Sequence, residues 1–350
     1  MLSFDGGGMR GYLSQQFMVK FCHLAAINPN EIWKHFDVIC GTSIGGIMAL
    51  ALAFGLSLDS LASFFTDDGK WIFTIRTAGD VLSGSHNASL PSNRPSTAQK
   101  VGILGNNDQF YNSAYPDSNY GSVYFKQRLV STFGTNTLQN LKTNVLIPSY
   151  KDDTKSPVMF SNLNYAEYIG QNELISNVSL ATSAAPLYLP PLPLNGNSLI
   201  DGGVFQNNPA RLGLVQATSI KPTFKRACVL SVGTGLGEVG FDEPITPGPL
   251  LASVPFEDTI KSLVGLFDAA IAGNQEAVHK GLSLEEQYTF NSVTLDNLYY
   301  YRFQVNLDPV QDNELDNSDA TYLTYLADAA IQRVNEDMDD LTNFIGHFLA

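Results

Sequence analysis

The chain has 350 residues, and its 20 Lys and Arg residues against 34 Asp and Glu residues give a formal net charge of −14. This charge excludes nucleic-acid binding as the main function, because few cations are left to neutralise phosphates. It also opposes electrostatic docking to an anionic bilayer. With 44% hydrophobic residues, the composition is that of a folded globular protein with a substantial core.

The first elements alternate between short apolar strands and helices. Residues 2–4 form an apolar run that ends at a glycine cluster, which predicts a buried strand. Apolar positions over 13–25 recur at helical spacing, and residues 36–40 predict a second buried strand. Residues 44–58 are apolar at most positions, so we expect a helix that is buried on nearly all sides.

The rest of the chain continues this alternation after a polar insert at about 74–124, which is rich in Ser, Asn, Gly and Pro. Such a long insert is typical of a lid or a mobile loop. Further strands are expected at 144–147, 158–160, 198–200 and 227–232. An amphipathic helix from about 320, with Ser318 or Asp319 as its N-cap, lies in an acidic helical part at about 306–350. The pattern predicts one α/β domain over 1–350, with a mainly parallel sheet flanked by helices.

The first motif, DGGGMRG at residues 5–11, lies between the first strand and the first helix. Consecutive glycines let backbone N–H groups converge on one point, and the helix N-terminus adds partial positive charge there. The loop therefore predicts an anion site, either for a bound phosphate or for a transient oxyanion.

Gly6, Gly8 and Gly11 also satisfy G-x-G-x-x-G, the fingerprint of dinucleotide-binding proteins. That fingerprint requires an acidic residue at the end of the next strand, where it holds a ribose hydroxyl. Here the next strand runs into CGTS at residues 40–43, without a carboxylate. A dinucleotide-binding oxidoreductase is thus an alternative that the sequence disfavours.

The second motif is GTSIG at residues 41–45, between the strand at 36–40 and the buried helix. This G-x-S-x-G pattern in a strand–turn–helix context is typical of a nucleophile elbow. Gly41 and Gly45 allow the tight turn that lifts the Ser43 hydroxyl above the sheet. The alternative is an ordinary turn in which Ser43 caps the helix, and we favour the nucleophile.

The third motif is DGG at residues 201–203, after the strand expected at 198–200, and in isolation it predicts a turn. A serine nucleophile needs a base, which in most such enzymes is a histidine. The sequence holds five histidines: His23, His35, His86, His279 and His347. None follows an expected strand in the way that a triad histidine does, so a histidine triad is disfavoured.

Together the three motifs resemble the patatin-like phospholipase family. That family combines a glycine-rich loop ending in Arg-Gly, a G-x-S-x-G elbow and a D-G-G aspartate, in this order. Segments 180–186, 207–209 and 230–235 are similar as well. The resemblance covers a core at 2–235, and beyond it no segment is recognised.

The resemblance implies a patatin-like three-layer α/β fold and a lipid acyl hydrolase of the phospholipase A or lysophospholipase type. Ser43 would attack the ester carbonyl to form an acyl-enzyme, and Asp201 would take its proton without a histidine. The implied donors to the oxyanion are the N–H groups of Gly6, Gly7, Gly8 and Met9. Implied supporting positions are Arg10, Gly41, Gly45 and Gly202.

A Ser–Asp dyad makes a physical demand on Asp201. A free aspartate has a pKa near 3.9 and is a poor base at neutral pH. Burial in a dry pocket raises the pKa of a carboxyl group. The apolar neighbours Ile200, Val204 and Phe205 predict such a pocket around Asp201.

No metal or other cofactor is expected, and the acidic stretch at 312–319 lacks the glycine of an EF-hand loop. The expected partner is a lipid, met in a transient contact with a membrane surface. The proline-rich apolar stretch at 187–194 is a candidate to line an acyl channel or to touch that surface, and core packing is the alternative. A catalytically silent lipid-binding module is a further alternative. With no signal peptide or membrane span visible, we expect a cytoplasmic protein.

Overall fold

The computed structural model describes residues 1–72, 122–163, 170–186, 188–237, 256–287, 297–311, 313 and 315–350, with the side chains of 71, 122–124 and 256–268 left out. The polar insert expected at 74–124 therefore lies almost wholly outside the described residues.

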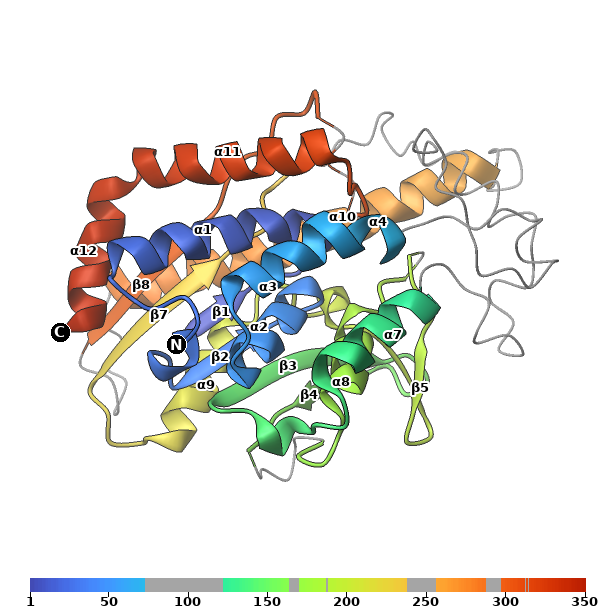
Figure 1. The fold of residues 1–350 in the computed structure, drawn as a ribbon, viewed down its shortest axis with the longest axis horizontal. Coiled ribbons are helices and arrows are strands. Elements are labelled where there is room, and N and C mark those ends of the chain that lie inside the picture. Colours follow the sequence, from blue (N-terminus) through green and yellow to red (C-terminus); the bar gives the residue numbers. More distant parts are fainter. Residues whose placement is uncertain are drawn as a thin grey trace.

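The described residues contain an eight-stranded sheet, with helices on both of its faces (Figure 1). Its strands are β1 (Leu2–Phe4), β2 (Val38–Gly41), β3 (Asn144–Lys151), β4 (Ser156–Phe160), β5 (Leu192–Leu194), β6 (Asn197–Asp201), β7 (Arg226–Val232) and β8 (Asn297–Phe303). The predicted strands are confirmed with shifts of a few residues, whereas β5 and β8 were not predicted.

The centre of the sheet is parallel, as predicted, and runs in the order β3-β2-β1-β7-β8. At one side β3 pairs antiparallel with both β4 and β6, and β6 pairs antiparallel with β5. The carboxyl ends of parallel strands meet at one edge of a sheet, where α/β proteins bind ligands. The loops after β1 and β2, which carry the first two motifs, consequently open side by side.

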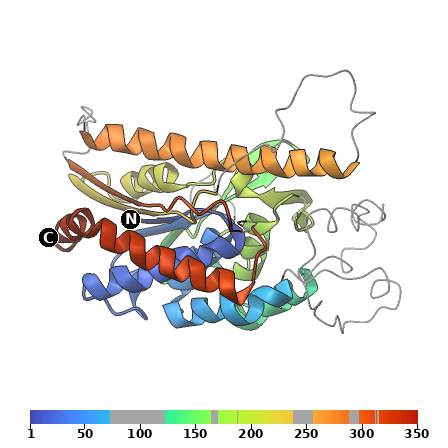
Figure 2. The ribbon, with the colours of Figure 1, turned by 90° about the horizontal axis from the view of Figure 1, so that it is seen from above.

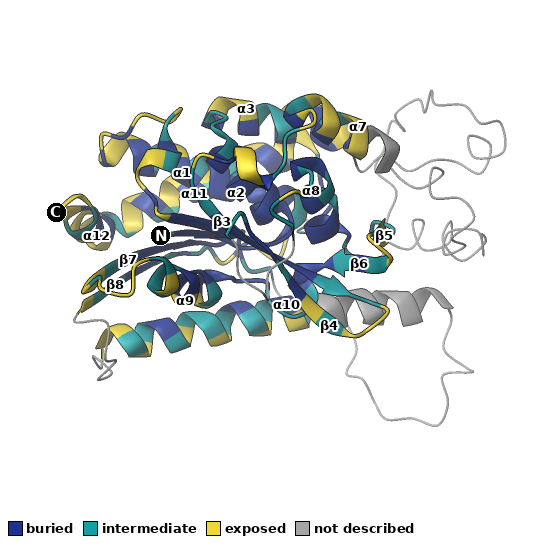
Figure 3. Ribbon diagram, turned by 90° about the horizontal axis from the view of Figure 1, so that it is seen from below, coloured by how far each residue is buried: buried dark blue, intermediate teal, exposed yellow. Residues whose placement is uncertain are grey.

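Helices cover both faces of the sheet and complete the three layers. Figures 2 and 3 show α9 and α10 on one face, and α1, α2 and α11 on the other. The described helices are α1 (Gly11–Leu24), α2 (Ile44–Phe54), α3 (Leu58–Ser63), α4 (Gly69–Ile72), α7 (Ser122–Phe133), α8 (Ile175–Ser183), α9 (Ala210–Ile220), α10 (Phe256–Gln287), α11 (Ala320–Glu336) and α12 (Met338–Leu349).

The helix expected at 44–58 ends earlier, because α2 stops at Phe54 and residue 58 is the first of a separate helix, α3. Helix α2 is buried at every position from 44 to 53 and contacts β1, β2 and β3, which confirms its predicted burial. It ends at Gly55, whose φ of +98° is the left-handed conformation that terminates many helices. The prediction of one continuous helix was wrong because this glycine caps α2, and α3 begins three residues later.

The C-terminal helix begins as predicted. The Asp319 side chain accepts the N–H of Thr321, which makes it the N-cap of α11. The buried residues of α11 are the predicted apolar positions Tyr322, Leu323, Leu326, Ala330 and Val334. None of the helices in the described ranges has the length and apolar character needed to cross a membrane.

Candidate active site

Ser43 lies in the turn between β2 and α2 with a strained backbone. Its φ of 56° and ψ of −128° are rare for a residue with a side chain. A β-carbon at Gly41 would lie 2.0 Å from the carbonyl oxygen of Gly45, so glycine is required at this position. The geometry is that of the nucleophile elbow that G-x-S-x-G predicts.

Asp201 is the last residue of β6 and is 2% exposed. Its Oδ1 accepts the N–H of Gly203 at 2.7 Å. Burial raises the pKa of Asp201 to about 7, against the lowering effect of hydrogen bonds from the Ser43 side chain and the Gly203 N–H. The direction of this shift agrees with the prediction, and the Ser43 side chain lies near enough to lower the pKa of this carboxyl group.

The end of α8 positions both residues. The N–H of Ser43 donates to Oγ1 of Thr182 at 3.0 Å, and the Thr182 hydroxyl donates to the carbonyl oxygen of Pro148 at 2.6 Å. Two residues later, the carbonyl oxygen of Ala184 accepts the N–H of Asp201 at 2.9 Å. Sequence reasoning marked 180–186 as similar to the family but gave it no role, because these contacts join segments far apart in the chain.

Two N–H groups of the glycine-rich loop are already engaged. The Gly6 N–H donates to the carbonyl oxygen of Asn207 at 3.2 Å, and the Met9 N–H donates to the carbonyl oxygen of Leu315 at 2.7 Å. The Gly6 carbonyl oxygen accepts the Thr234 hydroxyl at 2.8 Å. These bonds fix the path of the loop and leave Gly6 and Met9 without a free N–H.

Gly7 and Gly8 differ from their neighbours, since their N–H groups have no acceptor among the residues that the structure describes. Gly8 has a φ of +55°, and a β-carbon there would lie 2.0 Å from the carbonyl oxygen of Leu315. Both glycines line the same pocket as Ser43 and Asp201. The structure thus brings together parts of all three predicted motifs.

This pocket, which we call the Ser43 pocket, has a volume of about 50 Å³. That is room for a few water molecules and not for an acyl chain. Its walls are mostly apolar, and the apolar residues that line it are Met9, Ile44, Ile47, Phe64, Ile72, Phe125, Ala185, Leu189, Ile271 and Leu315. No histidine of the described ranges lines it; His279 and His347 lie on α10 and α12, and His86 is outside those ranges.

The remaining predicted positions, Arg10, Gly45 and Gly202, do not line the pocket themselves. Gly45 and Gly202 are buried beside Ser43 and Asp201 in the chain. Arg10 is 8% exposed and does not line the pocket, and its Nε has no hydrogen-bond partner within the described ranges. Across the same ranges, no group of three His, Cys, Asp or Glu side chains is placed to hold a metal ion.

A buried ion pair anchors the start of the glycine-rich loop. Nη2 and Nη1 of Arg302, on β8, lie 2.5 and 2.9 Å from the two carboxylate oxygens of Asp5. The two side chains are 5% and 0% exposed. Sequence reasoning missed Arg302, because a single arginine in an apolar stretch carries no local sign of a partner 297 residues away.

Comparison with known proteins gives a family. The family model for patatin-like phospholipases matches residues 2–214. A protein of Vibrio cholerae named cGAMP-activated phospholipase is 30% identical, over 96% of this chain and 90% of its own length. A calcium-independent phospholipase A2-gamma of Mus musculus is 27% identical, over 93% of this chain and 38% of its own.

A plant protein of the same family is also similar to this chain. Patatin-like protein 4 of Arabidopsis thaliana is 28% identical, over 67% of this chain and 59% of its own length. The matched region contains the glycine-rich loop, the serine turn and the aspartate that the structure brings to one pocket. The chain is a lipid-hydrolysing enzyme and belongs to the patatin-like phospholipase family.

Proposed function

We propose that the chain cleaves carboxylic ester bonds of membrane lipids, as a phospholipase A or lysophospholipase, through an acyl-enzyme on Ser43. The observation that carries this proposal is a strained serine that lines one pocket with a buried aspartate, whose pKa is raised to about 7. A carboxylate with that pKa is matched to accept a proton at neutral pH. The family match favours this reaction over a dinucleotide-dependent one.

In the first half-reaction, Oγ of Ser43 attacks the ester carbonyl carbon while its proton passes to the Asp201 carboxylate. The carbonyl oxygen becomes an oxyanion, and the N–H groups of Gly7 and Gly8 are the donors we propose for it. Those of Gly6 and Met9 are already bonded to carbonyl oxygens. Each such donor is worth roughly a hundred- to thousandfold in rate.

The intermediate then collapses. The C–O bond to the alcohol breaks, and Asp201 gives its proton to the leaving alkoxide. Water attacks the acyl-enzyme in the second half-reaction, with the Asp201 carboxylate as the base again. The fatty acid leaves, and the Ser43 hydroxyl is regenerated. No step needs a metal ion or an organic cofactor.

Hydrolysis requires an opening of the Ser43 pocket, because about 50 Å³ cannot hold an acyl chain. We propose that a small molecule controls this opening. The similarity over 96% of the chain to relatives named cGAMP-activated phospholipases supports cGAMP as that regulator.

Labelling with a fluorophosphonate tests the nucleophile and the opening together. The probe should modify Ser43, identified by peptide mass spectrometry, and cGAMP should raise the labelling rate. Fatty-acid release from phosphatidylcholine vesicles should rise in parallel. Folded protein that binds lipid but is not labelled, with or without cGAMP, would instead be a silent lipid-binding module.

We also propose that the chain around Leu189 contacts the membrane surface. Leu189 and Tyr188 line the Ser43 pocket and are partly exposed, and Pro190 and Pro191 hold the following backbone extended. Leu187, in the same apolar stretch, lies outside the described residues. Apolar side chains at the mouth of an apolar pocket suit contact with lipid chains.

Leu189→Asp should lower activity on phospholipid vesicles about tenfold or more, and activity on a short soluble ester by much less. The reason is that the added charge opposes contact with the bilayer and leaves the reacting groups in place. The measurement is initial rate on both substrates. Val215→Asp, at a 59% exposed position on α9, is the matched control and should change neither rate. Equal losses on both substrates would mean that Leu189 only packs.

A further inference from the structure

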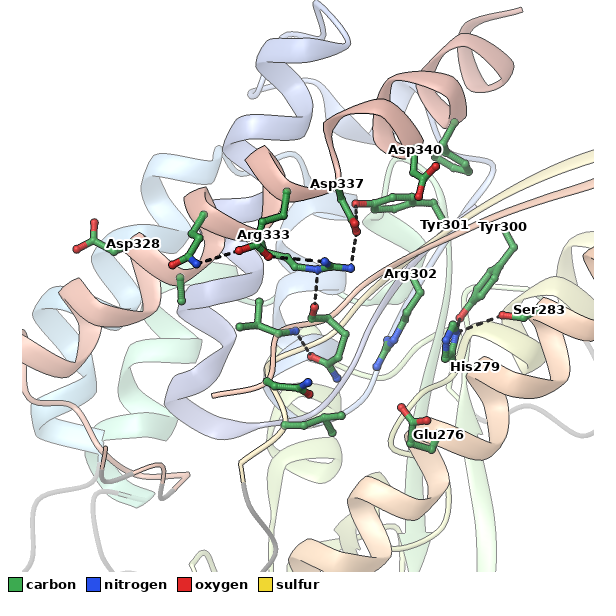
Figure 4. Close-up of a pocket in the computed structure, with 18 of the residues that line it drawn as sticks. Glu276, His279, Ser283, Tyr300, Tyr301, Arg302, Asp328, Arg333, Asp337 and Asp340 are labelled. Carbon is green, nitrogen blue, oxygen red and sulfur yellow. Dashed lines mark hydrogen bonds and ion pairs between the residues drawn. The ribbon is translucent and has the colours of Figure 1, made fainter. Parts of the chain in front are cut away.

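A second, larger cavity lies along the outer edge of β8, between α10 on one side and α11 and α12 on the other (Figure 4). We call it the β8 groove; its volume is about 1500 Å³. It shares no lining residue with the Ser43 pocket. Its floor is β8 itself, from Tyr299 to Arg302.

The β8 strand is an edge strand in the described sheet, so half of its backbone faces the groove. The Asn297 N–H donates to the carbonyl oxygen of Lys225, the residue before β7, and the Phe303 carbonyl oxygen accepts from Gly233, the residue after β7. Backbone groups alternate along a strand, so those of residues 298, 300 and 302 point outward. The Tyr300 N–H confirms this, because it donates to Oε1 of Glu286 on α10 at 2.9 Å.

The other outward groups are open. Across the described ranges, the N–H groups of Leu298 and Arg302 and the carbonyl oxygens of Leu298, Tyr300 and Arg302 have no hydrogen-bond partner. Arg302 is partly exposed as a residue although its side chain is only 5% exposed, so much of the exposed part is its backbone. This edge offers both donors and acceptors to a further strand.

The groove is strongly acidic on both of its walls. Seven carboxylates line it: Glu276, Glu286, Asp308, Asp328, Glu336, Asp337 and Asp340. The two arginines that line it are already paired, Arg302 with the buried Asp5 and Arg333 with Asp337. Figure 4 shows Glu276 on the α10 side, and Asp328, Asp337 and Asp340 on the α11 and α12 side.

We propose that the β8 groove binds a basic, extended segment of a partner polypeptide, which adds a strand to β8. Main-chain hydrogen bonds to the open edge would give the register. Side chains of a strand alternate between its two faces, so both sets would meet carboxylates. A polyamine could not accept from the N–H groups of Leu298 and Arg302. The charge disfavours a nucleotide phosphate and a second copy of this acidic chain.

The test is fluorescence anisotropy with a capped nonapeptide of alternating lysine and threonine. It should bind with an affinity that falls as salt rises. Asp328→Asn with Asp340→Asn should weaken binding about fivefold or more. The matched control, Asp339→Asn with Asp153→Asn, removes the same charge at exposed sites outside the groove and should change binding less than twofold.

Two readouts separate strand addition from simple attraction of a cation. The peptide should slow hydrogen exchange at the amides of Leu298 and Arg302. The same peptide with two adjacent N-methylated residues at its centre, which blocks both of its edges, should bind at least about tenfold more weakly. The proposal would be overturned if the N-methylated peptide bound as tightly as the parent peptide. It would also be overturned if the two double variants lost equal affinity, or if β8 gained no protection from exchange. Full displacement by spermine, without protection of β8, would assign the groove to polyamines.

Discussion

Ser43→Ala is expected to reduce fatty-acid release from phospholipid at least about 10,000-fold, because no acyl-enzyme can form without the hydroxyl. The residual rate would come from binding and from the Gly7 and Gly8 N–H groups alone. The substitution removes one buried oxygen, so the fold should persist. The measurement is fatty-acid release by mass spectrometry, with circular dichroism to confirm the folded state.

Ser183→Ala is the matched control, since Ser183 lines the same pocket but donates its hydroxyl to the carbonyl oxygen of Ser179 within α8. It should leave the rate within about threefold of the wild type. Asp201→Asn should lose nearly as much activity as Ser43→Ala. The double variant should be no worse than either single one, because the pair acts as a unit. A folded Ser43→Ala protein with wild-type activity would refute the proposed nucleophile.

Local motifs indicated which segments meet in the Ser43 pocket. They did not indicate the side chains that hold those segments in place. Glycine reports backbone geometry directly, so the loop at 5–11 and the turn at 41–45 could be placed from sequence alone. The turn at Gly55 was equally visible as a glycine, but the apolar run continued past it. A glycine that ends a helix and a glycine that is tolerated inside one look the same in the sequence. They differ only in the conformation of the residues that follow.

The supporting contacts had no comparable signal. Thr182 holds the Ser43 N–H across 139 positions of sequence, and Arg302 holds Asp5 across 297. Each is a common polar residue in an apolar context, and only tertiary packing brings it to its partner. Propensity and periodicity describe neighbours along the chain, so they cannot supply such pairs. The tyrosines of β8 are a local signal for a strand that the prediction passed over, whereas its position at the edge of the sheet is a property of the whole fold.

The raised pKa of Asp201 predicts opposite effects of pH on activity and on stability. Asp201 must be ionised to accept the Ser43 proton, so kcat/KM on a soluble ester should fall about tenfold per pH unit below a pKa of about 7 and level off above it. The measurement is a pH–rate profile from pH 5 to 9. A profile flat down to pH 5 would contradict this assignment of the base.

The stability of the fold should change with pH in the opposite direction to the activity. The folded carboxyl has a pKa of about 7, above its ordinary value of 3.8, so between these pH values the folded state holds a proton that the unfolded state has lost. The free energy of unfolding should therefore decrease by about 1.4 kcal/mol per pH unit from about pH 4 to 7, and by about 4 kcal/mol in all. Above pH 7 this contribution is constant.

Asp201→Asn removes that titration, because an amide carries no charge at any of these pH values. The variant should unfold at a higher urea concentration than the wild type at pH 8, with a difference that shrinks toward zero near pH 4. Asp153→Asn, at an exposed carboxylate, should show no such trend. The Asp201→Asn protein could instead be inactive and less stable than the wild type at pH 8. That result would mean that burial does not raise the pKa of this carboxyl group. An inactive and more stable variant would show that the ionised base is kept at a cost to the fold.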